Sequence, residues 1–152
     1  MKFKTEITYH LDENLWNKTL KTNQYSLASQ TAECYTPHKL TYNSKPVFIR
    51  ILDLSENIVG QLLAVIHIAD YGIKTNRISN LINSKFSSSS TLRWAHGPII
   101  HDQENYDEIL SDILLAVDKV SKENNVNLIS CTTPPRISNV PISIFKKNGY
   151  SI

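Results

Sequence analysis

The sequence predicts an α/β domain in which helices cover both faces of a single mixed sheet. The chain has 152 residues, the usual size of one compact domain. Its most apolar segments, residues 46–54 and 58–68, are consecutive strands whose side chains are hydrophobic almost without interruption, which is typical of strands covered on both faces. A strand, a long helix and another strand follow, and that order requires parallel pairing. The sheet is therefore expected to combine antiparallel and parallel neighbours.

The N-terminal part of the chain predicts one strand followed by two helices. Residues 6–9 alternate apolar and polar side chains, as a half-buried strand does. Asp12 is a suitable cap for a helix that carries Trp16 and Leu20 on one face. The segment 26–35 has no glycine or proline and spaces its apolar residues as a helix does, and Pro37 is expected to end that helix.

The central part predicts a long hairpin and then a loop. Residues 55–57 form the turn between the two apolar strands. Residues 71–90 contain the serine run 87–90 and show no sustained periodicity, and a connection of this length is typical of a functional or mobile loop. Strand character returns over residues 91–100, where Gly97 and Pro98 indicate a bulge or bend.

The C-terminal part predicts a helix, a strand and a second helix. Residues 103–124 form the clearest helix of the sequence because their aliphatic side chains recur at helical spacing, and Asp102 or Asn105 is expected to cap it. Residues 126–132 follow the pattern of a buried strand. After a loop that contains several prolines, residues 142–147 predict a short last helix.

Composition and charge exclude several classes of protein. A formal net charge of +2 and a pI near 8.5 lack the strongly basic balance of a dedicated nucleic-acid binder. The longest apolar run, residues 58–69, is interrupted by polar side chains and is too short to span a membrane. The N-terminus carries charged residues with no apolar segment behind them, which argues against a signal peptide and predicts a cytoplasmic protein. Cys34 and Cys131 lie in no spacing typical of a zinc site or a disulfide framework.

The order of the elements, together with residues 144–150, resembles the GNAT acyltransferases. The sequence IFKKNGY at 144–150 is similar to that family's closing signature of an apolar residue, polar residues, glycine and an aromatic residue. Four parts of the sequence resemble the FemAB branch of this family: Trp16, SLASQTAECY at 26–35, PVFIRILDLSENIVGQLL at 46–63 and RWAHGPII at 93–100. The resemblance implies a three-layer fold in which a mixed, mostly antiparallel sheet carries helices on both faces.

The FemAB resemblance also implies a function and an arrangement of domains. FemAB proteins resemble two GNAT-like domains in tandem, and they transfer amino acids from aminoacyl-tRNA to the peptide of a cell-wall precursor or to other amine acceptors. Residues 1–152 would supply one such domain without its last strands and without the second domain. Only residues 151 and 152 follow the closing signature, so we expect the sheet edge beside residues 126–132 to be partly open. A second copy of the chain or a partner segment would complete it.

Two departures from the GNAT pattern bear on the acyl donor and on catalysis. CoA-dependent members resemble one another in a glycine-rich loop whose backbone amides hold pyrophosphate at the start of the long helix. Here residues 97–108 contain a single glycine, Pro98 removes a donor, and the carboxylates at the helix start would repel a phosphate. We therefore expect no bound cofactor, and an aminoacyl-tRNA or another acyl donor in preference to acetyl-CoA. Phe145 takes the place of a tyrosine that can act as general acid in the family. Because phenylalanine has no proton to donate, this residue cannot be a general acid here.

A basic segment is the candidate for binding substrate. Residues 71–101 contain no Asp or Glu, and their Lys and Arg side chains suit a phosphate-bearing substrate such as a tRNA end. A solvated polar loop is the alternative interpretation. Arg136 follows the last strand, at the end of the sheet where α/β proteins usually bind ligands. The candidate substrate-binding residues are Lys74, Arg77, Arg93, Trp94, Gly97 and Arg136.

His96 is the candidate general base. Histidine titrates near neutral pH, and His96 lies at the strand bend, where side chains are exposed to ligands. A purely structural histidine is the alternative. His101 and Asp102 are adjacent in sequence, which does not aim two side chains at each other, and Asp102 suits a helix cap. We expect no metal site at His96, His101 and Asp102.

Two hypotheses of function remain open. In the first, the chain is an acyl or aminoacyl transferase domain of FemAB type, in which the backbone at Gly97 holds an acyl carbonyl while an amine attacks. In the second, it is a GNAT-like binding or dimerisation domain without catalysis. An acyl-CoA N-acetyltransferase with a degenerate CoA loop is a further alternative. Phe145 and the missing glycines favour the second hypothesis, whereas the strand bend and the basic segment favour the first.

Overall fold

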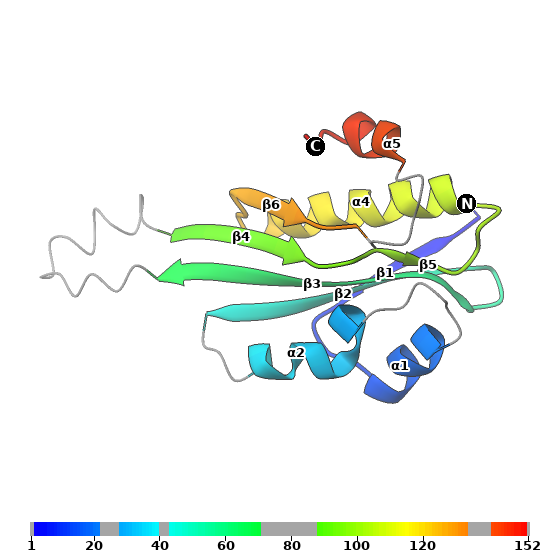
Figure 1. Cartoon of the computed structure of the whole chain (residues 1–152), viewed down its shortest axis with the longest axis horizontal. Coiled ribbons are helices and arrows are strands. Elements are labelled where there is room, and N and C mark those ends of the chain that lie inside the picture. Colours follow the sequence, from blue (N-terminus) through cyan, green and yellow to red (C-terminus); the bar gives the residue numbers. More distant parts are fainter. Residues whose placement is uncertain (1, 22–27, 40–42, 71–87, 134–140, 152) are drawn as a thin grey trace, which may run out of the picture.

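The computed structural model describes residues 2–21, 28–39, 43–70, 88–133 and 141–151. A six-stranded sheet lies between two layers of helices, with α1 and α2 on one face and α4 and α5 on the other (Figure 1). The elements are β1 (Lys4–Thr8), α1 (Glu13–Lys21), the 3-10 turn η1 (Ala28–Gln30), α2 (Ala32–Lys39), β2 (Ser44–Leu52), β3 (Ile58–Asp70), β4 (Ser88–Trp94), β5 (Ile99–Ile100), α4 (Tyr106–Glu123), β6 (Leu128–Cys131) and α5 (Ile142–Lys147).

The strand order of the sheet is β1-β2-β3-β4-β6, and the short strand β5 also pairs with β3. All the paired strands are antiparallel except β4 and β6, which run parallel because α4 carries the chain back between them. The predicted fold class, a mixed and mostly antiparallel sheet with helices on both faces, is confirmed. Within the described residues β6 pairs with β4 alone, so it is an edge strand.

Two separate hydrophobic clusters lie on the two faces of the sheet. The larger joins the sheet to α4, and its fully buried side chains include Ile49, Leu62, Leu110 and Ile113. The smaller joins the sheet to α1 and α2 and consists of Trp16, Leu20, Ala32, Tyr35, Phe48, Leu63 and Ile99. The long hairpin strands supply side chains to both clusters, which is why their sequence is almost continuously apolar.

Helix α4 packs very close to β3 at Gly60. A Cβ atom built on Gly60 would lie 2.5 Å from the Ile109 Cγ2 atom and 3.3 Å from the Ile113 Cδ1 atom. Because real Cβ atoms do not approach other atoms that closely, a glycine is required for this contact. The interruption of the apolar strand at residue 60 is therefore a packing requirement.

The first helix follows the sequence prediction and the second does not. The Asp12 carboxylate accepts a hydrogen bond from the backbone N–H of Leu15 at 3.1 Å, which confirms Asp12 as the cap of α1. Residues 26 and 27 of the helix expected over 26–35 lie outside the described residues, and from residue 28 on the structure has a 3-10 turn followed by α2. Pro37 lies inside α2. Proline removes one backbone hydrogen bond, and α2 extends only two residues further, to Lys39.

The second half of the chain confirms the element types with shifted boundaries. The serines 88–90 belong to β4 and pair with residues 68–70 of β3, so the expectation that they are part of the loop 71–90 is wrong for these three residues. The long helix begins at Tyr106, later than expected. Strand β6 alternates exposed and half-buried residues, so the prediction of a buried strand over residues 126–132 is wrong in its burial, and the cause is the position of β6 at the sheet edge.

Residues 71–87, most of the segment predicted as a loop, lie outside the described residues. Among the residues that the structure describes, no helix combines the length and the apolar character needed to cross a membrane.

Candidate functional site

The strand bend predicted at Gly97 and Pro98 interrupts the pairing of β3 with its neighbour. Val65 is opposite Arg93 and Gln61 is opposite Ile99, so residues 62–64 of β3 face the longer segment 94–98. The Gly97–Pro98 peptide bond in this segment is cis. The extra residues cannot follow the pleat of β3, and the backbone of Leu63 therefore needs other hydrogen-bond partners.

The side chain of Gln30 supplies those partners. Its Oε1 accepts a hydrogen bond from the Leu63 N–H at 2.8 Å, and its Nε2 donates to the Leu63 carbonyl at 3.2 Å and to the Ala95 carbonyl at 2.7 Å. The Gln30 backbone carbonyl accepts from the Trp16 indole N–H at 2.7 Å. Gln30 is fully buried, so its amide takes the place of a peptide group from a neighbouring strand and joins η1 to β3 and to the bend.

The other side of the bend is bonded to Thr132, just beyond β6. The Gly97 N–H donates to the Thr132 carbonyl at 3.2 Å, and the Thr132 N–H donates to the Trp94 carbonyl at 3.2 Å. The His96 N–H donates to the Thr132 hydroxyl oxygen at 3.0 Å. The Gly97 N–H, which we expected to hold an acyl carbonyl, is thus already used within the fold.

His96 lies at the bend with its backbone in the left-handed region, at φ 53°. The Ser29 hydroxyl donates to the Ala95 carbonyl at 3.2 Å, and the Ser29 oxygen lies 3.1 Å from the His96 Nδ1 atom. When the hydroxyl proton is directed to the Ala95 carbonyl, the Ser29 oxygen can accept from an Nδ1–H group of His96. In a neutral imidazole this tautomer leaves Nε2 as the proton acceptor, which is the state that a general base requires.

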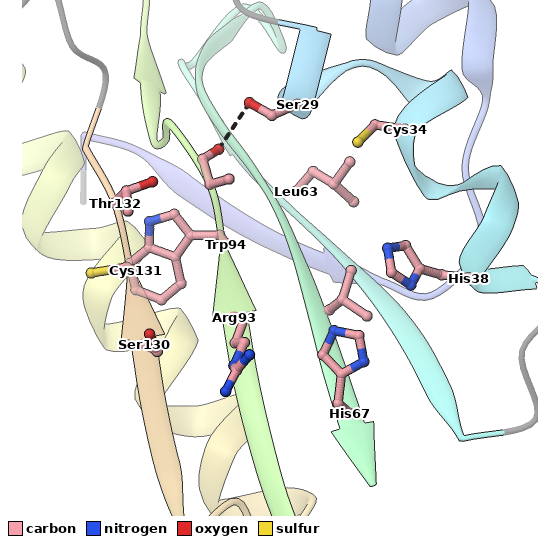
Figure 2. Close-up of a pocket in the computed structure, with 12 residues that line it drawn as sticks. Ser29, Cys34, His38, Leu63, His67, Arg93, Trp94, Ser130, Cys131 and Thr132 are labelled. Atoms are coloured by element: carbon pink, nitrogen blue, oxygen red, sulfur yellow. Dashed lines mark hydrogen bonds between the residues drawn. The ribbon is translucent and has the colours of Figure 1, made fainter. Parts of the chain in front are cut away.

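A cavity of about 280 Å³ opens beside this bend, between α2 and the strands β3, β4 and β6 (Figure 2). The cavity is lined by Ser29, whose hydroxyl contacts His96, and by Ala95, which precedes His96 in the chain. The face of β3 that carries Leu63, Val65 and His67 forms one wall. The complete lining is Ser29, Cys34, His38, Leu63, Val65, His67, Arg93, Trp94, Ala95, Ser130, Cys131 and Thr132.

The charged groups of the cavity are all cationic or able to become so. Its lining includes Arg93, His38 and His67, and no described Asp or Glu. The two imidazole rings pack edge to face with centroids 5.4 Å apart, and the Ser44 hydroxyl lies 3.1 Å from the His67 Nδ1 atom. Partial burial, followed by the positive charges of His38 and Arg93, lowers the pKa of His67. Burial raises the pKa of the Cys131 thiol, so this cysteine is not an activated nucleophile.

The structure brings part of the predicted site together. Arg93 and Trp94 line the cavity, and His96 and Gly97 form the bend beside it. The Trp94 ring is buried, with 5% of its surface exposed, and its indole N–H donates to the Gly97 carbonyl at 3.1 Å. The remaining predicted substrate-binding residues, Lys74, Arg77 and Arg136, lie outside the described residues.

The neighbouring pair His101 and Asp102 does not form a dyad. The His101 Nε2 atom lies 3.3 Å from the Gln61 Oε1 atom, and burial lowers the pKa of His101. The Asp102 carboxylate accepts hydrogen bonds from the backbone N–H groups of Glu104 and Asn105 at 3.1 and 3.2 Å, in the turn before α4. The N-cap residue of α4 is Asn105, the other residue expected there, and it makes no side-chain cap hydrogen bond. Within the described residues no group of histidine, cysteine and acidic side chains is arranged to hold a metal ion.

Sequence reasoning missed Ser29, Gln30, His38 and His67. Ser29 and Gln30 are ordinary polar residues in a short turn, and only the three-dimensional contact with β3 gives them a role. His67 carried a usable signal, because it interrupts an apolar strand on the face that Leu63 and Val65 share.

Comparison with known proteins establishes the fold. No protein-family model matches the chain, and no curated protein matches it either. A transcriptional regulator from Bacillus halodurans C-125 has a similar structure, with a TM-score of 0.60 at 14% identity over 97% of this chain and 93% of that one. An aminoglycoside acetyltransferase from an uncultured soil metagenomic sample gives a TM-score of 0.58 at 11% identity over 99% and 89% of the two chains. An aminoglycoside N-acetyltransferase in complex with CoA gives 0.56 at 10% identity over 98% and 92%.

At these identities the likeness concerns the fold, which is that of the GNAT acetyltransferases. The GNAT-like fold, which residues 144–150 and the order of the elements implied, is thereby confirmed. The narrower FemAB resemblance stays a prediction.

Proposed function

We propose that this chain is an acyl-transfer domain of GNAT fold that moves an acyl or aminoacyl group to an amine, as FemAB proteins do. The observation that carries the proposal is a cavity beside a bent strand, at whose edge the Ser29 hydroxyl oxygen lies 3.1 Å from the His96 Nδ1 atom. In the FemAB arrangement a second GNAT-like domain would accompany this one.

The proposed reaction needs one new bond, one broken bond and one proton acceptor. The amine nitrogen forms a bond to the acyl carbonyl carbon, and the bond from that carbon to the carrier oxygen or sulfur breaks. The amine loses a proton to the His96 Nε2 atom, and the leaving carrier atom takes up a proton. Holding the amine in the cavity with the acyl group next to it raises the rate, because it replaces a bimolecular encounter.

The start of α4 supports a donor other than acetyl-CoA. In the turn before α4, the Asp102 carboxylate accepts from the Glu104 and Asn105 N–H groups, so these two donors are not available to a phosphate. Asp107 and Glu108 add negative charge to the first turn. Both features oppose a pyrophosphate at this position, so an aminoacyl ester such as aminoacyl-tRNA is the donor that we propose.

A binding domain without catalysis is the second candidate. Phe145 is 3% exposed and packs edge to face on Tyr150 with ring centroids 5.7 Å apart, so the residue in the general-acid position has a structural role. The Gly97 N–H is also already bonded to Thr132. These two observations favour a GNAT-like fold retained for binding.

Transfer of label from charged tRNA separates the two candidates. The purified chain is incubated with aminoacyl-tRNA that carries a labelled amino acid and with an amine acceptor, and the acceptor is analysed for label. A parallel reaction contains labelled acetyl-CoA. The first candidate predicts transfer from aminoacyl-tRNA, and loss of a proton acceptor in His96→Gln should reduce the rate by roughly 10²- to 10⁴-fold.

The exposed His10 provides the matched control, and His10→Gln should leave the rate unchanged. Transfer that survives His96→Gln at the full rate would remove His96 from the mechanism. Absence of transfer from either donor would favour the binding domain.

A further inference from the structure

The end of the cavity away from His96 is cationic, and none of the described residues that line it is acidic. Arg93 projects from β4, His67 from β3 and His38 from α2, and all three line the same cavity (Figure 2). No ion pair joins Arg93 to a carboxylate anywhere in the described part of the chain. The sheet brings these side chains together because Val65 pairs with Arg93 and His67 follows two residues later on the same face of β3.

Such a cluster is costly in the absence of a ligand. Like charges that share a site oppose each other's protonation, and the lowered pKa of His67 has the neighbouring positive groups among its causes. An anion placed between the guanidinium and the imidazoles would remove this cost and would gain charge-assisted hydrogen bonds. Ser130 and Thr132 line the same cavity and add hydroxyl groups to it.

We propose that the cavity binds an amine acceptor that carries an anionic oxygen group, a carboxylate or a phosphate, held by Arg93, His67 and His38. The inference rests on the proposed function in one respect, which is the identity of the ligand as the acceptor of acyl transfer. A cavity of about 280 Å³ is small, at the lower end of the range for ligand pockets, so the group that it takes is of amino-acid size.

The geometry also orders the ligand. The anionic group would lie at the end near Arg93 and His67, while Ser29 and Ala95 mark the end where His96 is oriented. An acceptor of amino-acid size, bound with its anionic group at the first end, would then present its amine toward His96. The cationic cluster thus selects the acceptor and fixes the direction in which it enters.

Binding of small probes tests the proposal without any acyl donor. The probes are L-alanine and phosphoethanolamine, each compared with a neutral-headed analogue that keeps the amine, alaninamide and ethanolamine respectively. Binding is followed by amide and imidazole chemical shifts in two-dimensional NMR spectra of the full chain. We expect the anionic probes to shift resonances of Arg93, His67 and His38, and the analogues to bind about five- to tenfold more weakly or not at all.

Variants provide the second comparison. Arg93 is exposed, so Arg93→Gln should fold normally and should weaken the anionic probe by about five- to tenfold. The exposed Lys119 lies on α4, on the opposite face of the sheet, and Lys119→Gln loses the same charge without affecting the cavity.

The possible results separate the ligand from the reaction. Selective binding of L-alanine identifies a carboxylate, and selective binding of phosphoethanolamine identifies a phosphate. Equal binding of charged and neutral probes, no binding of either, or an equal loss in Arg93→Gln and Lys119→Gln overturns the proposal. Probe binding without any acyl transfer would support the anion site and contradict the proposed function. Acyl transfer to neutral amines only would support the proposed function and contradict the anion site.

Discussion

Replacing Gln30 by methionine should destabilise the protein strongly. Methionine has a similar length and fills the same buried space, so water is kept out, but its side chain neither donates nor accepts well. The substitution removes the hydrogen bonds to the Leu63 N–H, the Leu63 carbonyl and the Ala95 carbonyl. Leu63 is 4% exposed, so its backbone groups cannot turn to solvent.

The size of the effect follows from these contacts. A buried polar group left without a partner costs about 1–3 kcal/mol, and two groups of Leu63 lose their partners on this side of the strand. The Ala95 carbonyl also accepts from the Ser29 hydroxyl, so its loss is smaller. We expect Gln30→Met to lower the free energy of unfolding by roughly 3–5 kcal/mol, a large part of the 5–15 kcal/mol that is usual for a domain.

Urea denaturation followed by circular dichroism measures this difference, and hydrogen exchange at the Leu63 amide shows where it arises. The control is Gln103→Met, because Gln103 is exposed and makes a hydrogen bond to the Ile100 carbonyl at 2.8 Å. The control should lose at most about 1 kcal/mol. A loss below about 1 kcal/mol in Gln30→Met, with an unchanged denaturant slope, would show that the amide does not support the bend.

Four further predictions concern the bend, the donor site, pH and the sheet edge. Gly97→Ala would place a Cβ atom 2.8 Å from the Leu62 Cδ1 atom and should cost about 1–3 kcal/mol in urea denaturation. Acetyl-CoA should bind weakly or not at all in calorimetry, and a micromolar dissociation constant would contradict our interpretation of the start of α4. The pKa of His101 is lower in the folded than in the unfolded state, so the unfolded chain binds more protons near and below pH 6.5 and stability should fall there as pH decreases; denaturation midpoints that fall as steeply in His101→Gln would contradict this. If the edge of β6 mediates self-association, Leu128→Lys at this 54% exposed position should shift sedimentation toward the monomer, and an unchanged distribution would argue against that edge.

The sequence was most informative where a local pattern was reinforced over many residues. The two hairpin strands and the helix at residues 142–147 could be predicted because apolar spacing and turn residues act within a few positions of each other. Pro37 misled the prediction because the packing of α2, through Tyr35 against Phe48, outweighs one lost backbone hydrogen bond.

The candidate site was less predictable because its members are far apart in sequence. The contact between Ser29 and His96 joins residues 67 positions apart, and nothing in either local segment indicates it. His96 could be identified since it lies on the bend itself, where glycine and proline mark the irregular strand. Arg93 could be identified since it belongs to the basic segment that leads into the bend. Residues 62–64 of β3 face the longer segment 94–98, and this difference in length becomes visible only once the strands are paired. The need for Gln30 beside Leu63 follows from it.

The unequal hydrophobic clusters on the two faces of the sheet have a consequence for how a ligand reaches the cavity. The layer formed by α1, η1 and α2 packs on the sheet through the smaller cluster and through Gln30, so we expect it to have the lower free energy of local opening. One wall of the cavity, with Cys34 and His38, belongs to this layer, and the opposite wall belongs to the sheet that α4 stabilises. A ligand that contacts both walls ties the weaker unit to the stronger one, so amide protection should rise in α2 on binding while that of α4 stays constant. The same local opening equilibrium of this layer then controls both how the ligand enters and how rigid the bound state is.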